Sequence, residues 1–254
     1  MAIVKDFKVD ALRVRVFSSR NEMGQCAGLE AAKAINDVIA KKGFANVMFA
    51  AAPSQNETLA TLCAQNVDWS KVNAFHMDEY VGLDPKHPAG FRNFLKAAIF
   101  DKFAFKSVNL INGNASNLED ELARYTDLLK KYPLDVCLCG VGENGHIAFN
   151  DPSVADFKDS ALIKIVKLEE KCRMQQVHDG CFNDISEVPT HAFTVTIPGM
   201  TSSDCMLCTV PAITKAEASK HMLNDEVSEA CPATILRQHK DARLYLDPDS
   251  ASLL

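Results

Sequence analysis

A short apolar segment that ends in a glycine-rich loop is the feature that most constrains the fold of this chain. Residues 134–139 (LDVCLC) are predicted to form a buried strand, and Gly140–Pro152 follows directly with the sequence GVGENGHIAFNDP. Glycines at 140, 142 and 145 allow the backbone to turn tightly and to approach a ligand closely. Ligands of open α/β sheets bind at the carboxyl ends of the strands. We therefore expect His146 and Asp151 at a ligand-binding edge of a sheet.

Strand-like and helix-like patterns alternate along nearly the whole chain. The predicted strands are 12–17, 46–51, 72–75, 134–139, 161–166, 191–198, 205–210 and 242–246, and the predicted helices are 21–42, 57–65, 91–103, 118–131, 169–177 and 214–223. Gly43 is placed to end the first helix. Since no repeat or low-complexity linker interrupts this alternation, it predicts one α/β domain over residues 1–254. The domain would hold a single doubly wound, mostly parallel sheet with helices on both faces.

Composition excludes several classes of function. The 254 residues carry a net charge of −6 and no stretch dense in lysine and arginine, which argues against nucleic acid as a partner but leaves a small anionic substrate open. No run of 18 apolar residues is present, so we expect no membrane span. The nine cysteines are odd in number and scattered, and the first ten residues do not resemble a signal peptide, so we expect reduced thiols in the cytoplasm. Cys205 and Cys208 have CxxC spacing, but without a second pair they are expected to be core residues rather than metal ligands.

Three loops that follow predicted strands should meet at one edge of the sheet. In the first loop, Ser54 and Glu57 form a capping-box pattern, and a helix start of this kind can bind a phosphate, although most such starts bind nothing. In the second loop, Asp78 and Glu79 are adjacent carboxylates after an apolar strand. Partial burial of one of them would raise its pKa into a range useful for proton abstraction, whereas a solvated acidic turn is the alternative.

The third loop and two later cations complete the candidate residues. An imidazole such as that of His146 can carry a proton between two oxygens, and Asp151 can select its tautomer, although a histidine that only hydrogen-bonds within a turn would look the same. Lys215 and Arg173 could clamp a phosphate, or each could simply be solvated.

Taken together, these segments resemble the glucosamine-6-phosphate deaminase (isomerase) family. The resemblance spans nearly the whole chain, and the first two of its motifs are specific when they occur together. It is carried by Met77–Leu83 (MDEYVGL), Gly140–Pro152, Val188–Val195 (VPTHAFTV), the helix around Lys215, and Cys231–Leu236 (CPATIL).

The resemblance implies a Rossmann-like fold and conversion of a hexosamine 6-phosphate to a keto-sugar phosphate and ammonia. By position, Asp78 matches the enolisation base and His146 the ring-opening acid/base, while Asp151 stands where the family usually has a glutamate. Lys215 matches a phosphate-binding lysine. The resemblance implies no metal and no organic cofactor, because each step is a proton transfer or an imine hydrolysis. A small sugar phosphate is the expected partner, and self-association into a homo-oligomer is possible for this fold.

The chain departs from the family pattern at several positions. Asn144 stands where many members have an aspartate that assists ring opening, so it can orient His146 but cannot exchange a proton. The phosphate loop offers Ser54, Gln55 and Asn56 in place of a Gly-Gly-Thr-Pro sequence. The family's phosphate-binding arginine has no gapless match, and Arg173 is the nearest candidate. The predicted catalytic set is Asp78, His146, Asp151 and Asn144, and Glu79 and Gly145, which neighbour Asp78 and His146, complete the predicted substrate-binding set.

Two other functions compete with the deaminase hypothesis. 6-Phosphogluconolactonases share the Gly-x-Gly-x-x-Gly-His loop and hydrolyse an ester without an enolisation base. They tend to have Asp-Glu-Arg where this chain has Asp78-Glu79-Tyr80, and a Leu-Phe-Pro-Gly turn where it has Phe149–Pro152. A catalytically weak sugar-phosphate-binding module is the second alternative. A DNA-binding regulator is disfavoured, because only Met1–Ala11 precede the first predicted strand.

Overall fold

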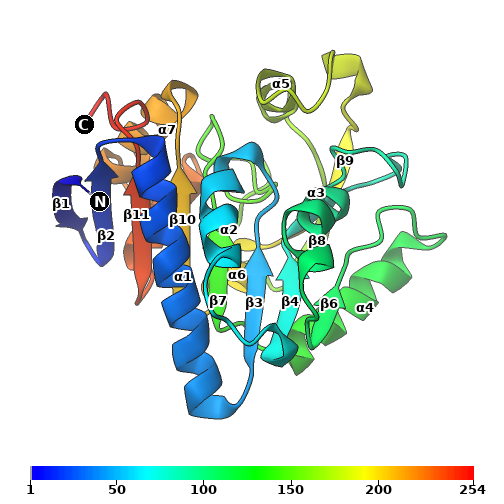
Figure 1. Ribbon diagram of the computed structural model, residues 1–254. Coiled ribbons are helices and arrows are strands. Elements are labelled where there is room, and N and C mark those ends of the chain that lie inside the picture. Colours follow the sequence, from blue (N-terminus) through cyan, green and yellow to red (C-terminus); the bar gives the residue numbers. More distant parts are fainter. Residues whose placement is uncertain (1) are drawn as a thin grey trace.

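An eight-stranded sheet forms the middle of the protein, and helices lie against both of its faces (Figure 1). The structure, a computed structural model, describes residues 2–254; Met1, the first residue of the predicted 1–254 domain, lies outside the described residues. The strand order is β1-β2-β11-β10-β7-β3-β4-β6. The strands are β1 (Ile3–Val9), β2 (Leu12–Phe17), β3 (Ala45–Phe49), β4 (Val72–His76), β6 (Ser107–Asn109), β7 (Val136–Cys139), β10 (Cys205–Val210) and β11 (Ala242–Leu246). Every neighbouring pair is parallel except β1 with β2. The predicted doubly wound, mostly parallel sheet is therefore confirmed.

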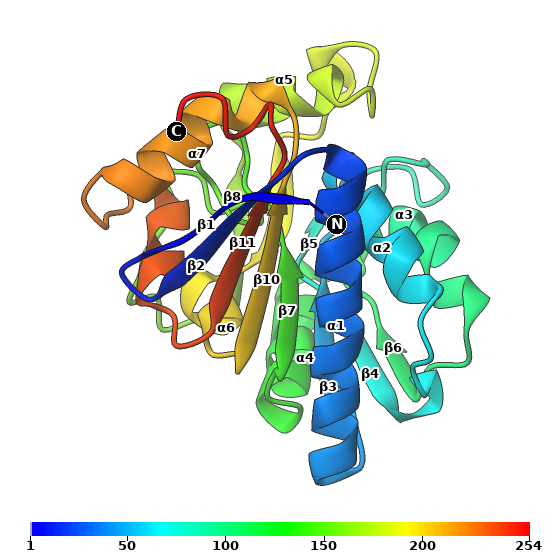
Figure 2. The same ribbon diagram turned by 60° about the vertical axis from the view of Figure 1, so that its left-hand side comes forward.

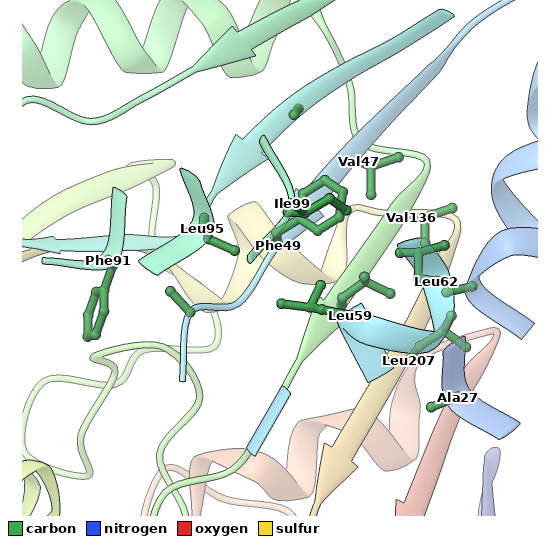
Figure 3. Packing of buried hydrophobic residues seen from close by; sticks show 14 of the residues in the cluster. Ala27, Val47, Phe49, Leu59, Leu62, Phe91, Leu95, Ile99, Val136 and Leu207 are labelled. Carbon is green, nitrogen blue, oxygen red and sulfur yellow. The ribbon is translucent and has the colours of Figure 1, made fainter. Parts of the chain in front are cut away.

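Alternating side chains of the central strands supply two hydrophobic cores. Val47 and Phe49 of β3 pack on one side of the sheet, and Met48 packs on the other. The first core is covered by α1 (Arg20–Lys42), α2 (Asn56–Cys63) and α3 (Phe91–Ala98), and Figure 3 shows Leu59, Leu62, Leu95 and Phe91 gathered around it. The second core is covered by α4 (Leu118–Lys131), α6 (Ile197–Thr201) and α7 (Ala216–Asn224). Strands buried on both faces explain the nearly continuous apolar runs in the sequence.

The direction of the chain connections reverses between β3 and β7. The chain leaves β3 towards β4 and β6, and it leaves β7 towards β10 and β11 on the opposite side. The loops after β3 and β7 therefore diverge to opposite faces, which leaves a crevice at the carboxyl ends of these two strands. This is the edge at which the sequence predicts the ligand site.

A second, three-stranded antiparallel sheet stands beside the main sheet, in the order β5-β9-β8. It contains β5 (Asp78–Tyr80), β8 (Ile163–Lys167) and β9 (His191–Val195), so two predicted strands that were expected in the main sheet lie here instead. The predicted strand 191–198 ends early because Thr196 caps α6: its hydroxyl accepts a hydrogen bond from Gly199 N, and Pro198 lies in the first turn. α5 (Glu170–His178) lies between β8 and β9 in the chain and above the carboxyl ends of the central strands (Figure 1).

The first predicted helix, 21–42, is confirmed to within one residue. It runs from Arg20 to Lys42, with Ser19 as N-cap and Gly43 as C-cap. The strand β1 was not predicted: it pairs with β2 at the edge of the sheet (Figure 2), and its largely exposed side chains provide little apolar pattern. Among residues 2–254, no helix has the length and apolar character needed to cross a lipid bilayer.

The packing of α1 against α2 depends on a glycine. A Cβ atom at Gly28 would lie 2.6 Å from Thr61 Cβ and 2.7 Å from the carbonyl oxygen of Thr58, both on α2. Such distances are shorter than van der Waals contact, so only glycine permits this close approach. The approach matters for the site because it brings the start of α1, at Arg20, next to Glu57 on α2.

We predict that Gly28→Val destabilises the fold by about 1–3 kcal/mol, because the added side chain overpacks the α1–α2 contact. Urea unfolding followed by circular dichroism measures the effect. Ala40→Val, on an exposed position of the same helix, is the control for the lower helix propensity of valine. If Gly28→Val and Ala40→Val lowered the free energy of unfolding by equal amounts, this account of the α1–α2 contact would be contradicted.

Candidate active site

A cleft with about 740 Å³ of open space lies at the carboxyl ends of β3, β4, β7 and β10. The loops after these strands contribute Ser54, Asp78, His146 and Lys215 to its lining. The three predicted loops therefore meet, and a fourth segment, after β10, joins them. The remaining lining residues are Arg20, Ala50, Ala51, Ala52, Pro53, Gln55, Met77, Phe91, Gly140, Val141, Gly142, Ala148, Phe149, Gln175, Gln176, Asp179, Pro211, Ala212 and Thr214.

The two adjacent carboxylates Asp78 and Glu79 have different surroundings. Asp78 lines the cleft, is 8% exposed, and its Oδ1 has no hydrogen-bond partner among the described residues. Burial, together with the nearby charge of Glu79, raises the pKa of Asp78 well above its ordinary value. An imperfectly solvated carboxyl group of this kind is suited to take up a proton.

Glu79 lies outside the residues that line the cleft, which corrects its predicted place in substrate binding. Its Oε1 accepts hydrogen bonds from Tyr80 N (3.0 Å) and Phe91 N (3.1 Å), and its Oε2 accepts one from Arg92 N (2.9 Å). Glu79 therefore caps the start of α3. The reason is the pleat of the short strand β5, which turns successive side chains to opposite sides.

A buried histidine that sequence reasoning did not single out holds the backbone at Asp78. His76 Nε2 accepts a hydrogen bond from Ile111 N (2.8 Å), so Nδ1 carries the proton and donates it to the carbonyl oxygen of Asp78 (2.9 Å). Complete burial lowers the pKa of His76 to about 4. The imidazole is therefore neutral, and it serves as a fixed support beneath the cleft.

His146 is oriented by Asn144 and Asp151. Its Nδ1 lies 2.6 Å from Asn144 Oδ1 and 3.0 Å from Asp151 Oδ1. Asn144 Oδ1 also accepts a hydrogen bond from His146 N, whereas Asn144 Nδ2 donates to Asp151 Oδ1 at 2.9 Å. If the Asn144 amide were reversed, its NH2 group would face the N–H groups of His146 and its oxygen would face the Asp151 carboxylate. The orientation of the amide therefore follows from its partners. Because both neighbours of Nδ1 are acceptors, Nδ1 carries the proton, and Nε2 of the neutral ring is a base.

Asp151 stays ionised beneath His146. Burial acts to raise the pKa of Asp151, but hydrogen bonds from His146, Asn144 and the backbone of Glu169 outweigh burial, and the net shift is downward. Asp151 is itself fully buried and does not reach the cleft. Gly142 makes room for the ring: a Cβ atom there would lie 2.1 Å from His146 Cε1.

The phosphate-binding candidates are divided between the cleft and its surroundings. Lys215 lines the cleft, is 4% exposed, and its Nζ has no hydrogen-bond partner among residues 2–254. Burial lowers the pKa of Lys215, and the nearby charges of Asp179 and Glu143 oppose that shift in part. An unpaired buried ammonium group is costly unless an anion binds to it.

The predicted capping box at Ser54 is absent. Ser54 lies in a 3-10 turn (Pro53–Gln55) before α2, and Glu57 instead pairs with Arg20 at 2.8 Å. Gln55 lines the cleft, but its amide is tied to its neighbours: Oε1 accepts from Thr209 Oγ1 at 3.0 Å, and Nε2 donates to Ser54 Oγ at 3.2 Å.

Three other predicted binding residues lie outside the cleft lining. Arg173 Nη2 donates to the carbonyl oxygens of Ile185 (2.6 Å) and Val188 (2.7 Å), so its guanidinium is used within the protein. Asn56 begins α2 with an exposed side chain. Gly145 packs against Cys231, where an added Cβ would lie 2.6 Å from the sulfur. These placements correct the predicted binding set.

The comparison with known protein families decides the classification. A family model described as glucosamine-6-phosphate isomerases/6-phosphogluconolactonase matches residues 18–246. The chain belongs to this family.

Among curated members of the family, the glucosamine-6-phosphate deaminase of Bacillus cytotoxicus is 35% identical over 221 residues, which cover 87% of this chain and 82% of the relative. That of Listeria monocytogenes is 34% identical over 213 residues, covering 84% of this chain and 89% of the relative. The solved structure of a monomeric glucosamine-6-phosphate deaminase superposes with a TM-score of 0.87 at 29% identity, covering 95% of this chain and 99% of that one. A 6-phosphogluconolactonase from Thermotoga maritima gives a TM-score of 0.74 at 15% identity, covering 93% and 99%, which shows a shared fold.

For this family member, sequence reasoning missed several polar residues of the cleft. Arg20 comes from the start of α1, and Gln175, Gln176 and Asp179 come from α5 and its end. Gln175 and Gln176 lie inside the predicted helix 169–177 and Asp179 lies just beyond it, so the rule that located the other residues could not find these three. Arg20 does follow the predicted strand 12–17, but no motif in the sequence singles it out. Gly24 and Gly28, one helical turn apart on α1 and both packed against α2, were the available signal for Arg20, since they indicate a close helix contact.

One group of side chains among residues 2–254 has the chemistry of a metal site. His146, Asp151 and Cys172 place a ligand atom each within 4.8 Å of one another, and all three are buried. The proton on His146 Nδ1 already bridges Asn144 and Asp151, so a cation would have to displace it. Burial also raises the pKa of the Cys172 thiol well above its ordinary value, which disfavours the thiolate that a metal requires.

We predict that Asp78→Asn stabilises the protein at neutral and alkaline pH by roughly 1–3 kcal/mol, because a buried carboxylate without partners is removed. The folded-state pKa of Asp78 is raised above the ordinary 3.8, so the folded form holds this proton more tightly than the unfolded chain does. The stability contribution of Asp78 is therefore full below about pH 3.8 and is lost as the pH rises through the folded-state pKa.

Urea unfolding at several pH values measures this linkage. Asp127→Asn, at an exposed site on α4, is the matched control and should leave the pH profile unchanged. If the free energy of unfolding of Asp78→Asn depended on pH in the same way as that of the wild type, the assigned environment of Asp78 would be contradicted.

Proposed function

We propose that this protein is a glucosamine-6-phosphate deaminase that converts glucosamine 6-phosphate and water to fructose 6-phosphate and ammonia. One observation carries the proposal: a carboxyl group (Asp78), an imidazole (His146) and an unpaired ammonium group (Lys215) line the same cleft. Two curated relatives named glucosamine-6-phosphate deaminase, 35% and 34% identical over most of this chain, support it. The substrate is a small sugar phosphate.

Ring opening is the first task, because the C2 proton becomes acidic only beside an open-chain aldehyde. A proton must leave the hydroxyl oxygen O1 and another must reach the ring oxygen O5. The unprotonated Nε2 of His146 takes the first proton and returns it to O5, while Asp151 stabilises the imidazolium that exists between the two transfers. A positioned acid/base of this kind contributes about 10²–10⁴ in rate.

Isomerisation is the task of Asp78. The Asp78 carboxylate removes the proton from C2 while a proton of the C2 ammonium group passes to O1, which gives an enolamine, and the resulting carboxylic acid then delivers its proton to C1. The product is an imine at C2, which adds water and then releases ammonia. The raised pKa of Asp78 favours this exchange, since the group must both accept and return a proton. The cationic amine on C2 of the incoming substrate promotes ionisation of the carboxyl group beforehand.

The phosphate group binds at the other end of the cleft. Lys215 supplies a buried cation without a hydrogen-bond partner among residues 2–254, and Ser54 supplies a hydroxyl group. We assign the second cation to Arg20 in place of Arg173. Arg20 Nε and Nη2 are held by Glu57 and by the carbonyl oxygen of Pro53, each at 2.8 Å, which leaves Nη1 for a ligand. Anchoring of the phosphate holds C2 against Asp78, so that remote binding energy assists the reaction.

The remaining expectations are consistent with this role. All nine cysteines are unpaired, which supports a reducing compartment, and we place the protein in the cytoplasm. We propose that the chain acts as one unit, and self-association stays a prediction that sedimentation analysis would test.

The direct test is a panel of sugar phosphates assayed for ammonia and ketose phosphate. We expect turnover of glucosamine 6-phosphate, with galactosamine 6-phosphate and 6-phosphogluconolactone as comparison substrates. In D₂O, the wild type should exchange the C2 proton, and Asp78→Asn should lose this exchange, because an amide cannot act as the base.

Lactone hydrolysis without ammonia release would instead favour the lactonase alternative. Binding of the sugar phosphate with no turnover of any substrate would favour a sensing module. Unchanged proton exchange in Asp78→Asn would remove Asp78 from its proposed role, whereas Asp127→Asn should behave as the wild type.

A further inference from the structure

A second carboxylate, Glu169, is connected to His146 through Asn144. Glu169 precedes α5, and its partly exposed side chain lies next to the Gly140–Pro152 loop that contains His146. Its Oε2 accepts a hydrogen bond from Asn144 Nδ2 at 3.2 Å, and its Oε1 accepts one from Ser153 N at 3.0 Å. Its backbone N–H donates to Asp151 Oδ2 at 3.2 Å. One residue thus touches both groups that orient His146.

The Asn144 amide has a full set of partners. Its oxygen faces two N–H groups of His146, and its nitrogen faces the carboxylates of Asp151 and Glu169. The two carboxylates make one orientation of the amide favourable, and that orientation presents an acceptor to His146 Nδ1. With a single carboxylate the amide would lose one of the two contacts that select this orientation.

Glu169 lies away from the substrate. It lines a separate hollow together with Ser153, Arg173 and Ile185, and it lies outside the residues that line the cleft. Any influence of Glu169 on the reaction must therefore pass through Asn144 and Asp151. This placement distinguishes a positioning residue from a catalytic one.

We propose that Glu169 is a positioning residue that, with Asn144, keeps the proton of His146 on Nδ1 and Nε2 free to act as the base. The inference rests on the proposed ring-opening role of His146. It also explains why residue 144 is an amide in this chain: a third carboxylate beside Asp151 and Glu169 would be repelled by both. The neutral residue at 144 and the acid at 169 are therefore a matched pair.

The proposal predicts a reciprocal rescue. Glu169→Gln should lower kcat roughly tenfold with little change in KM, a part of the 10²–10⁴ that positioned proton transfer contributes. Asn144→Asp should lower kcat about a hundredfold, because the extra negative charge favours the protonated imidazole and shifts the acidic limb of the pH profile to higher pH. The double variant Asn144→Asp/Glu169→Gln restores the original charge count and a donor–acceptor pair, so its kcat and pH profile should return to within about tenfold of the wild type.

Glu170→Gln, at the neighbouring exposed residue, is the matched control and should behave as the wild type. Thermal unfolding of each variant separates a folding defect from a positioning defect. The proposal would be overturned if Glu169→Gln kept the kcat and pH profile of the wild type. It would also be overturned if the losses of kcat in the two single variants simply added in the double variant.

A measurement independent of turnover separates this inference from the proposed function. The ¹⁵N chemical shifts of the His146 ring report which nitrogen carries the proton. We expect the Nδ1–H tautomer in the wild type and a mixture of tautomers in Glu169→Gln. The same single tautomer in both proteins would overturn the inference. Absence of ammonia release by the wild type would instead count against the deaminase activity alone.

Discussion

The reversal of connections between β3 and β7 is the constraint on which the rest of the site depends. Because the chain leaves these neighbouring strands towards opposite sides, no loop fills the space above their carboxyl ends. The residues placed there must turn away quickly, which accounts for the short 3-10 turn after β3 and the glycine loop after β7. Asp78 and His146 come from separate strands, yet they line the same cleft. The sheet thus positions the chemical groups before any ligand binds.

The electrostatic state of each group distinguishes function from support. Asp151 and Glu79 are buried, but their oxygens accept hydrogen bonds from several donors. Asp78 Oδ1 and Lys215 Nζ are buried without any such partner among the described residues. Both of these atoms belong to residues of the cleft, so the unfavourable free energy of burying them is offset only when a ligand supplies a cation or an anion. Under the proposed function, the fold gives up stability at these two positions in favour of binding and catalysis.

Much of this arrangement could be predicted from the sequence because it depends on local pattern. The apolar strand before Gly140, the helix that ends at Gly43 and the meeting of Ser54, Asp78 and His146 follow from periodicity and from the common direction of parallel strands.

Contacts between distant segments could not be predicted in this way. Arg20 reaches the cleft through a helix–helix contact, and Glu169 reaches Asn144 from the far side of the loop. Arg173 was only the nearest candidate for a phosphate-binding arginine that has no gapless match, and its guanidinium donates to the carbonyl groups of Ile185 and Val188 instead. The second sheet could not be predicted either, because an alternating apolar and polar pattern predicts a strand but not the strands with which it pairs.

The most direct test of the account is a crystal structure with the open-chain alditol of glucosamine 6-phosphate, which lacks the aldehyde and cannot react. We predict one molecule in the cleft, with its phosphate against Lys215 and Arg20, its C2 against the Asp78 carboxyl group, and its O5 within hydrogen-bond distance of His146 Nε2. A ligand whose phosphate lies at another place, or which contacts only one of Asp78 and His146, would contradict the claim that these two groups act on a single sugar.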